Sequence, residues 1–214
     1  METIKIGAHE WTTKNLDLLE MQDGSTLTVA KSFKEWIDLC NSEKPCAAAY
    51  DFNEKNKGKY GFLYNSFAIK QASKWIPDGW RISTRNDWED LFAVAGSNTP
   101  ENKHTQSELL FKIKSIKGWR GKINFTHPLN GSNELGFNAL PGGIITSSLF
   151  SCEFFDLGTG TGWWTAELHH PHITSYDKVR FGILPQNAVD DYSECLDPKK
   201  SKSKLGHYVR LVKE

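Results

Sequence analysis

The chain has 214 residues, and its 26 Lys and Arg residues balance its 26 Asp and Glu residues, so its formal net charge at pH 7 is zero. Without net charge, the overall field draws the protein neither to nucleic acid nor to an anionic membrane. No apolar run approaches the ~20 residues that cross a bilayer, and residues 1–20 lack the basic start and apolar centre of a secretory signal. We therefore expect a soluble protein without membrane insertion, located in the cytoplasm, in a virion or secretion apparatus, or at the cell surface if a signal was removed.

Apolar residues at helical spacing predict three helices. The first covers residues 31–41 behind a Ser32 N-cap, and the second follows a capping sequence at residues 84–87. A third, weaker pattern follows Ser107. The three apolar stripes are Phe33, Trp36, Ile37 and Cys40; Trp88, Leu91, Phe92 and Ala95; and Leu109, Leu110, Ile113 and Ile116.

Short β-strands account for most of the remaining regular structure. The expected strands are Ile4–Ile6, Trp11–Leu16, Ala47–Phe52, Trp80–Ser83, Lys178–Ile183 and His207–Val212. Residues 95–106 and 190–206 are expected to be loops, and the lysine-rich run at 199–204 is interpreted as solvated. No repeat or linker interrupts the pattern, so the sequence predicts one α+β domain over residues 1–214.

Aromatic residues are unusually frequent, with eight Trp and twelve Phe against two Met. Each ring buries ~150–250 Å², so rings can hold together a domain that is rich in loops. Trp80, Trp88, Phe137 and Trp163 lie in predicted elements or beside glycines, and we expect them to be buried and structural.

A search for catalytic motifs finds none. The chain lacks GxSxG, HExxH, the phosphate-binding GxxxxGK[ST] and the dinucleotide fingerprint. The glycine-rich segment 158–162 precedes Trp163 and Trp164 rather than a helix, so it is interpreted as a turn. We expect a protein that is not an enzyme and needs no cofactor.

The histidines and cysteines are candidate metal ligands and nucleophiles. His169, His170 and His172 are close in sequence, but Pro171 is expected to break strand and helix periodicity, which favours an exposed loop over a metal site. Cys40, Cys46, Cys152 and Cys195 include no CxxC pair, which favours free thiols. A local bridge between Cys40 and Cys46 is left as the alternative.

Read in order, blocks of the sequence resemble the Fibrobacter succinogenes major paralogous domain family. The blocks are IGAHEW at 6–11, NL at 15–16, DG at 23–24, KYGFLYNSFA at 59–68, PDGWRIST at 77–84, GFNALPGG at 136–143, WWTAE at 163–167 and YVRLVK at 208–213. The family's usual proline is replaced by Ser83, and its second aromatic residue after Asn65 is replaced by Ser66. Residues 169–205 follow the family pattern least.

The resemblance implies a C-type lectin-like fold, related to the formylglycine-generating enzyme and to variable receptors diversified by retroelements. Such a fold would have small twisted antiparallel sheets flanked by two main helices, with the N- and C-terminal strands paired. It also implies a bacterial or phage protein. Fold does not fix function, so the function is weighed separately.

The leading functional hypothesis is a non-catalytic module that binds a protein or glycan through the loops after Trp164, as in an adhesin or a diversified receptor. A formylglycine-generating-type oxidase and a calcium-dependent lectin are the alternatives, and homo-oligomerisation is left open. An oxidase would need paired copper-binding thiols, whereas Cys152 and Cys195 are not in the expected context. The order Pro185-Gln186-Asn187 does not match the lectin motif.

The expected contact residues are polar and aromatic side chains in the stretch after Trp164, which departs most from the family pattern and where a rigid scaffold can display variable chemistry. They are Glu167, His169, His170, His172, Tyr176, Lys178, Asn187, Asp190, Asp191 and Tyr192. Tyr176 and Tyr192 are expected to contribute most, because aromatic anchors carry a large share of interface energy. Arg180 and Arg210 are interpreted as supporting residues.

Overall fold

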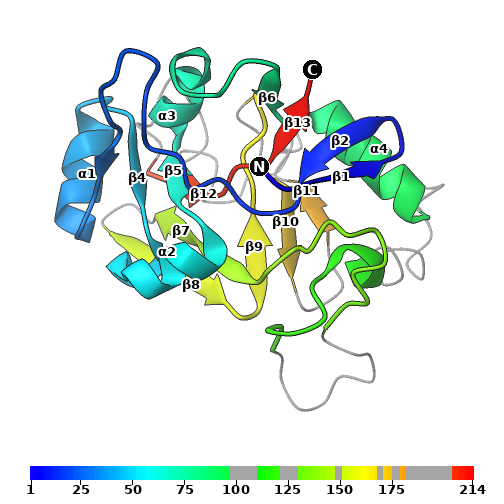
Figure 1. Ribbon diagram of the computed structural model, residues 1–214. Helices are drawn as coiled ribbons and strands as arrows, with labels where there is room; N and C mark the ends of the chain where they lie inside the picture. Colours follow the sequence, from blue (N-terminus) through cyan, green and yellow to red (C-terminus); the bar gives the residue numbers. More distant parts are fainter. Residues whose placement is uncertain (97–109, 121–129, 148–150, 168–170, 175–178, 182–203) are drawn as a thin grey trace, which may run out of the picture.

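The computed structural model describes residues 1–96, 110–120, 130–147, 151–167, 171–174, 179–181 and 204–214. These residues form a mixed α+β structure (Figure 1). The helices are α1 (Phe33–Asn41), α2 (Glu54–Tyr60), α3 (Ser66–Lys70) and α4 (Arg85–Ala95), with 3₁₀ turns η1 (Tyr50–Phe52) and η2 (Ala72–Lys74). The strands are β1 (Thr3–Ile6), β2 (His9–Thr12), β3 (Thr28–Val29), β4 (Cys46–Ala48), β5 (Leu63–Asn65), β6 (Trp80–Ile82), β7 (Gly142–Ser147), β8 (Cys152–Leu157), β9 (Gly160–Gly162), β10 (Pro171–Thr174), β11 (Val179–Phe181), β12 (Gly206–His207) and β13 (Leu211–Lys213).

One sheet joins the two ends of the chain in the order β1-β2-β13-β6. Strand β13 pairs antiparallel with β2 and with β6, whereas β1 pairs only with β2 within this sheet. The expected direct pairing of the first and last strands is therefore wrong in detail. The N-terminal hairpin places its second strand, β2, beside β13, and β1 lies at the sheet edge.

The second sheet has nine strands and mixed direction. Its main path is β11-β10-β9-β7-β12-β5-β4-β3, and β8 pairs with β7. The pairs β3–β4 and β7–β9 are parallel. The expectation of small antiparallel sheets is thus corrected to one small antiparallel sheet and one larger mixed sheet.

Two predicted helices are confirmed, together with their caps. The Ser32 hydroxyl accepts the Glu35 amide at 3.2 Å and begins α1. Thr84 and Asp87 form a reciprocal capping box at the start of α4, which satisfies two of the free amides of that helix end. In the third pattern, residues 110–113 are helical, but Ile116 is 65% exposed, so it does not belong to the buried stripe.

Several predicted strands are shorter than expected. The strand predicted over residues 11–16 ends at Thr12. The backbone of Leu16 is hydrogen-bonded to Val209 and Phe62 instead of continuing the β1–β2 pairing. Residues 47–52 divide into β4 and η1, and residues 207–212 divide into β12 and β13. Helices α2 and α3 and strand β5 were not predicted.

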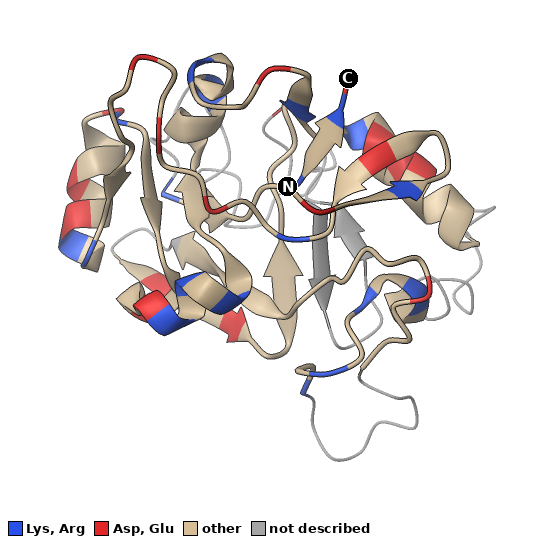
Figure 2. Cartoon of the chain, viewed as in Figure 1, with Lys and Arg blue, Asp and Glu red and all other residues tan. Residues whose placement is uncertain are grey.

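The core consists of two clusters of buried side chains. Trp11, Trp36, Trp88, Phe137 and Trp163 belong to the first cluster, and each is fully buried. The second cluster packs around Tyr64 and Trp75, whose rings stack with centroids 4.9 Å apart. Charged side chains of both signs lie on the outer helices α1, α2 and α4 (Figure 2).

Candidate functional site

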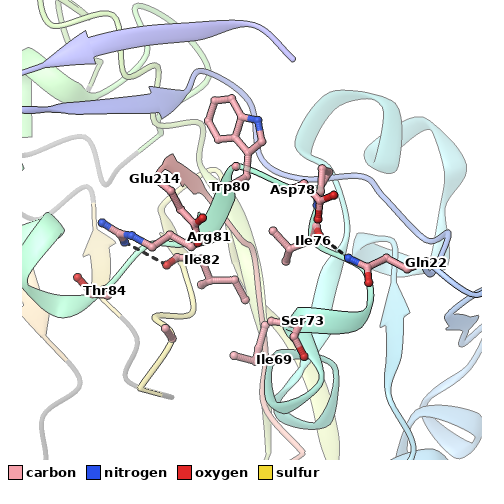
Figure 3. Close-up of a pocket in the computed structure, with 14 residues that line it drawn as sticks. Gln22, Ile69, Ser73, Ile76, Asp78, Trp80, Arg81, Ile82, Thr84 and Glu214 are labelled. Carbon is pink, nitrogen blue, oxygen red and sulfur yellow. Dashed lines mark hydrogen bonds between the residues drawn. The ribbon is translucent and has the colours of Figure 1, made fainter.

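A cleft of about 390 Å³ lies beside β6, one of the two edge strands of the four-stranded sheet; we call it the β6 cleft. Its polar lining residues are Gln22, Ser73, Asp78, Arg81, Thr84 and Glu214. Its other lining residues are Ile69, Ala72, Ile76, Pro77, Gly79, Trp80, Ile82 and Ala166. Figure 3 shows Arg81, Ile82 and Glu214 on one side of the cleft and Gln22, Ser73 and Ile76 on the other.

The turn that leads into β6 forms one end of the cleft. The Trp80 amide donates to the Pro77 carbonyl at 3.1 Å, and Gly79 has φ of 75°, a left-handed conformation that favours glycine. On the opposite wall, the Gln22 side chain donates to the Ile76 carbonyl at 3.3 Å. These contacts stabilise the turn at one end of the cleft and the wall formed by Gln22 and Ile76.

Arg81 is held by the N-terminus of α4. Its Nη2 donates to Asp87 Oδ1 at 2.8 Å, and its Nη1 donates to Asp87 Oδ2, so the pair is bidentate. The Asp87 side chain is 3% exposed and the Arg81 side chain 34% exposed. The buried carboxylate therefore fixes a guanidinium that still reaches solvent at the cleft.

The Asp87 carboxyl is electrostatically tuned by opposing effects. Burial alone would raise its pKa, but hydrogen bonds from Arg81 and from the amide and hydroxyl of Thr84 outweigh burial and lower the pKa. His9 Nδ1 lies 3.4 Å from the same carboxylate, and His9 Nε2 lies 3.0 Å from Asp90. Asp87 thus connects β2, β6 and α4 around one charge.

This arrangement predicts acid-sensitive stability. Because the folded-state pKa of Asp87 lies below the ordinary value of 3.8, its contribution is present above that value and is lost as the pH falls through the folded pKa. Replacing Asp87 with Asn should lower the unfolding free energy at pH 7 by about 2–4 kcal/mol and flatten its decrease below pH 4. Urea unfolding at pH 3 to 7 measures both effects, and an unchanged acid slope in Asp87→Asn would contradict the assignment.

Trp80 differs from the other rings that we expected to be structural. Trp88, Phe137 and Trp163 are fully buried as expected, but Trp80 is only half-buried and lines the cleft. The turn at Pro77–Gly79 brings its ring to the surface at the end of the sheet. Trp80 is thus less buried than expected, although it still packs against the second core cluster.

The described part of the predicted contact face adjoins the β6 cleft. Ala166 lines the cleft and its amide donates to the Ser83 carbonyl at 3.0 Å. Glu167 is exposed, and its Oε2 accepts the Arg85 amide at the start of α4 at 3.2 Å. One predicted contact residue is thus placed next to the cleft.

Of the other predicted contact residues, the structure describes only His172, as part of a strand. His172 belongs to β10, where it is paired in register with Gly162 and Arg180. Pro171 begins this strand, so the expectation that it breaks strand structure is wrong; the first position of a strand tolerates proline. His169, His170, Tyr176, Lys178, Asn187, Asp190, Asp191 and Tyr192 lie outside the described residues.

Three of the four cysteines lie within the described residues. Cys40 and Cys46 are buried free thiols, Cys152 is buried, and Cys195 lies outside the described residues. Within the described residues, no three His, Cys, Asp or Glu side chains are grouped so that they could hold a metal ion. The described helices include none with the length and apolar character needed to cross a membrane.

Sequence reasoning missed the cleft because its walls come from distant segments. Trp80 and Arg81 were read as part of a scaffold block, and Glu214 lies more than a hundred residues further on. The available signal was the sequence Pro77-Asp78-Gly79-Trp80, in which a tight turn places a carboxylate beside a large ring.

Comparison with known proteins extends the family resemblance to nearly the whole chain. The family model described as Fibrobacter succinogenes major domain matches residues 4–213. No curated protein and no solved structure matches the chain.

Proposed function

The chain belongs to the Fibrobacter succinogenes major domain family, and from that premise we propose that it is a non-catalytic recognition module for a protein or glycan. Its binding face comprises the β6 cleft and the segment that follows Trp164. The proposal includes a C-type lectin-like architecture and a role as an adhesin or a diversified receptor in bacteria or phages.

The observation that carries this proposal is that the β6 cleft is lined both by a partly exposed aromatic residue, Trp80, and by Arg81, whose guanidinium is fixed by Asp87. Binding sites commonly combine an apolar surface with a few convergent polar groups, and a volume of about 390 Å³ suits a small group such as a sugar ring or a pair of amino-acid side chains. The ring supplies contact area at low entropic cost, because a Trp side chain has only two rotatable bonds.

The polar groups around the ring favour hydrogen-bonding ligands. Asp78 and Glu214 offer carboxylate acceptors, whereas Gln22 offers an amide and Ser73 and Thr84 offer hydroxyls. Arg81 is already paired with Asp87, so the cleft carries little free positive charge for an anionic ligand. Neutral polyhydroxylated or peptide ligands fit this chemistry best.

No described feature favours the alternative functions. Cys152 is a buried residue of β8, and no three Asp, Glu, His or Cys side chains of the described residues are grouped as metal ligands. We therefore propose neither a formylglycine-generating-type oxidase nor a calcium-dependent lectin.

The proposal is tested by identifying a ligand on glycan and peptide arrays and then measuring its affinity for Trp80→Ala. We expect a loss of at least tenfold, because truncating an aromatic anchor commonly costs ~2 kcal/mol. Phe155→Ala is the matched control, since Phe155 is a 53% exposed ring on β8 that does not line the cleft. It should leave affinity unchanged.

Two further variants separate the cleft from the following segment. Tyr176→Ala and Tyr192→Ala should each weaken binding if the face continues beyond Trp164. If Trp80→Ala and both tyrosine variants bind like the parent, or if Phe155→Ala abolishes binding, the proposed face is wrong. Melting temperatures of all variants show whether a loss reflects unfolding.

A further inference from the structure

Two buried cysteines lie at the two ends of the turn that connects α1 to β4. Cys40 lies in the last turn of α1, Cys46 is the first residue of β4, and both side chains are fully buried in the same core cluster. Each thiol shifts the pKa of the other, so the two side chains lie close together.

The connection between the two cysteines is a tight, hydrogen-bonded turn. Three backbone amides in this turn donate to backbone carbonyls: Ser42 to the Asp38 carbonyl at 3.0 Å, Glu43 to the Cys40 carbonyl at 3.0 Å, and Lys44 to the Leu39 carbonyl at 2.9 Å. Glu43 has φ of 58°, a left-handed conformation that reverses the chain direction. This backbone fixes the separation of Cys40 and Cys46.

Asn65 holds the pair from the other side. Its Nδ2 lies 3.6 Å from Cys40 Sγ and donates to the Lys44 carbonyl at 2.9 Å, while its Oδ1 accepts the Cys46 amide at 3.1 Å. One side-chain amide thus contacts the first sulfur, the turn and the backbone of the second cysteine. The two cysteines are oriented by the fold and do not merely lie close together.

The two thiols differ in acidity. The hydrogen bond from Cys46 lowers the pKa of Cys40 despite burial, with further help from Asn65 and the Lys204 charge, whereas the same hydrogen bond and burial raise the pKa of Cys46. A thiolate is the nucleophile in thiol–disulfide exchange. In the folded chain, Cys40 is therefore the more acidic of the two thiols.

We propose that Cys40 and Cys46 form an intramolecular disulfide when the chain folds in the presence of a small-molecule disulfide such as oxidised glutathione. The Cys40 thiolate attacks one sulfur of the oxidant, which releases one reduced thiolate and leaves a mixed disulfide on Cys40. Cys46 loses its proton to solvent and attacks Cys40 Sγ, which releases the second reduced thiolate. The two cysteines lose two electrons, and the oxidant gains them.

Burial sets when the reaction takes place. Both side chains are shielded in the folded protein, so the exchange occurs while the turn at residues 41–45 is forming and before α1 packs on β4. Afterwards the same burial protects the bond from reduction. Whether the pair is reduced or disulfide-bonded therefore depends on the redox conditions in which the chain folded.

The test maps the linkage in the full chain refolded from urea in a buffer of reduced and oxidised glutathione. After alkylation of free thiols, cleavage after glutamate separates residues 36–43 from residues 44–54, because Glu43 lies between the two cysteines. We expect these two peptides to stay linked until a reductant is added. The linked species should lack two hydrogen atoms relative to the reduced pair.

Two variants serve as matched controls. Cys152→Ser should retain the linkage, because Cys152 is a buried thiol outside the turn. Cys46→Ser should leave no linked peptides, with Cys40 either alkylated or joined to glutathione. The proposal is overturned if both cysteines of the parent chain remain alkylatable or carry glutathione, or if either is linked to Cys152 or Cys195. The measurement on the parent chain decides this even if a variant fails to fold.

Discussion

Replacing Trp88 with alanine is expected to lower the free energy of unfolding by about 3–5 kcal/mol, a large part of the ~5–15 kcal/mol that stabilises a typical domain. Trp88 is fully buried, and its ring contacts those of Trp11, Phe137 and Trp163 with centroids 5.1 to 5.4 Å apart. Truncation would leave a cavity lined by rigid rings, which cannot readily collapse into it.

A polar contact adds to this loss. The Trp88 indole donates to the Ser83 hydroxyl at 3.0 Å inside the core. Ser83 also donates its amide to the Arg210 carbonyl at 3.2 Å, a bond that a proline, which is usual at this position in the family pattern, could not make. Trp88→Ala therefore leaves a buried hydroxyl without this partner.

Equilibrium urea unfolding of Trp88→Ala and Trp80→Ala measures the difference between a core ring and a cleft ring. Trp80 is half-buried, so its truncation should cost no more than about 1–2 kcal/mol. Trp88→Phe should recover part of the loss. Equal losses for the two alanine variants would contradict the distinction between core and cleft.

Replacing Asn15 with alanine is expected to destabilise the protein by about 3–5 kcal/mol, because it deprives a buried charge of an acceptor. Asn15 Oδ1 accepts hydrogen bonds from Trp163 Nε1 and from Arg210 Nε, both at 2.8 Å, and Asn15 Nδ2 donates to the Tyr60 carbonyl at 2.7 Å. One short side chain thus satisfies groups from three distant segments.

The buried charge of Arg210 explains why the loss of the Asn15 side chain is expected to be destabilising. Its guanidinium is fully buried, and burial lowers the pKa of Arg210 to about 9. Among the described residues, its partners are neutral acceptors: Asn15 Oδ1, the Thr12 carbonyl at 2.6 Å and the Asn138 carbonyl at 3.2 Å. The guanidinium also lies 4.6 Å from the Phe137 ring centroid, a stabilising cation–π distance.

A double-mutant cycle isolates this dependence. Once Arg210 is replaced by Met, no charge needs the Asn15 oxygen, so Asn15→Ala should cost about 1–3 kcal/mol less than in the parent chain. Unfolding free energies of the two single variants and the double variant give the coupling. Additive losses would contradict the role of Asn15 as an acceptor for the buried guanidinium.

Features that depend on neighbouring residues were predicted well from the sequence. Helices α1 and α4 combine an apolar stripe with a side-chain cap, and both signals lie within a few residues of each other. Helix α2 has the sequence EKNKGKY, which contains no apolar stripe, and tertiary packing of Tyr60 stabilises it instead. Strands of three residues, such as β5, are too short to show alternation.

Features that depend on the order of strands were not predictable in the same way. Apolar alternation identified β1 and β13 as strands, but it carries no information about which strand lies between them. The β6 cleft could not be predicted for the same reason, because its lining residues Gln22, Trp80 and Glu214 come together only once the sheets have formed. Of the ten predicted contact residues, Glu167 alone has a described side chain, and it lies beside the cleft.

The position of β13 between β2 and β6 has a consequence for how the protein folds. The Leu211 amide donates to the Thr12 hydroxyl across 199 residues of sequence, and Val212 is paired with Trp11. During synthesis, the β1–β2 hairpin must therefore keep one edge unpaired until residues 211–213 leave the ribosome. Pairing across such a separation is slow, because the loop must close before its contacts form, so the nascent hairpin is exposed to association with other chains while residues 13–210 are synthesised.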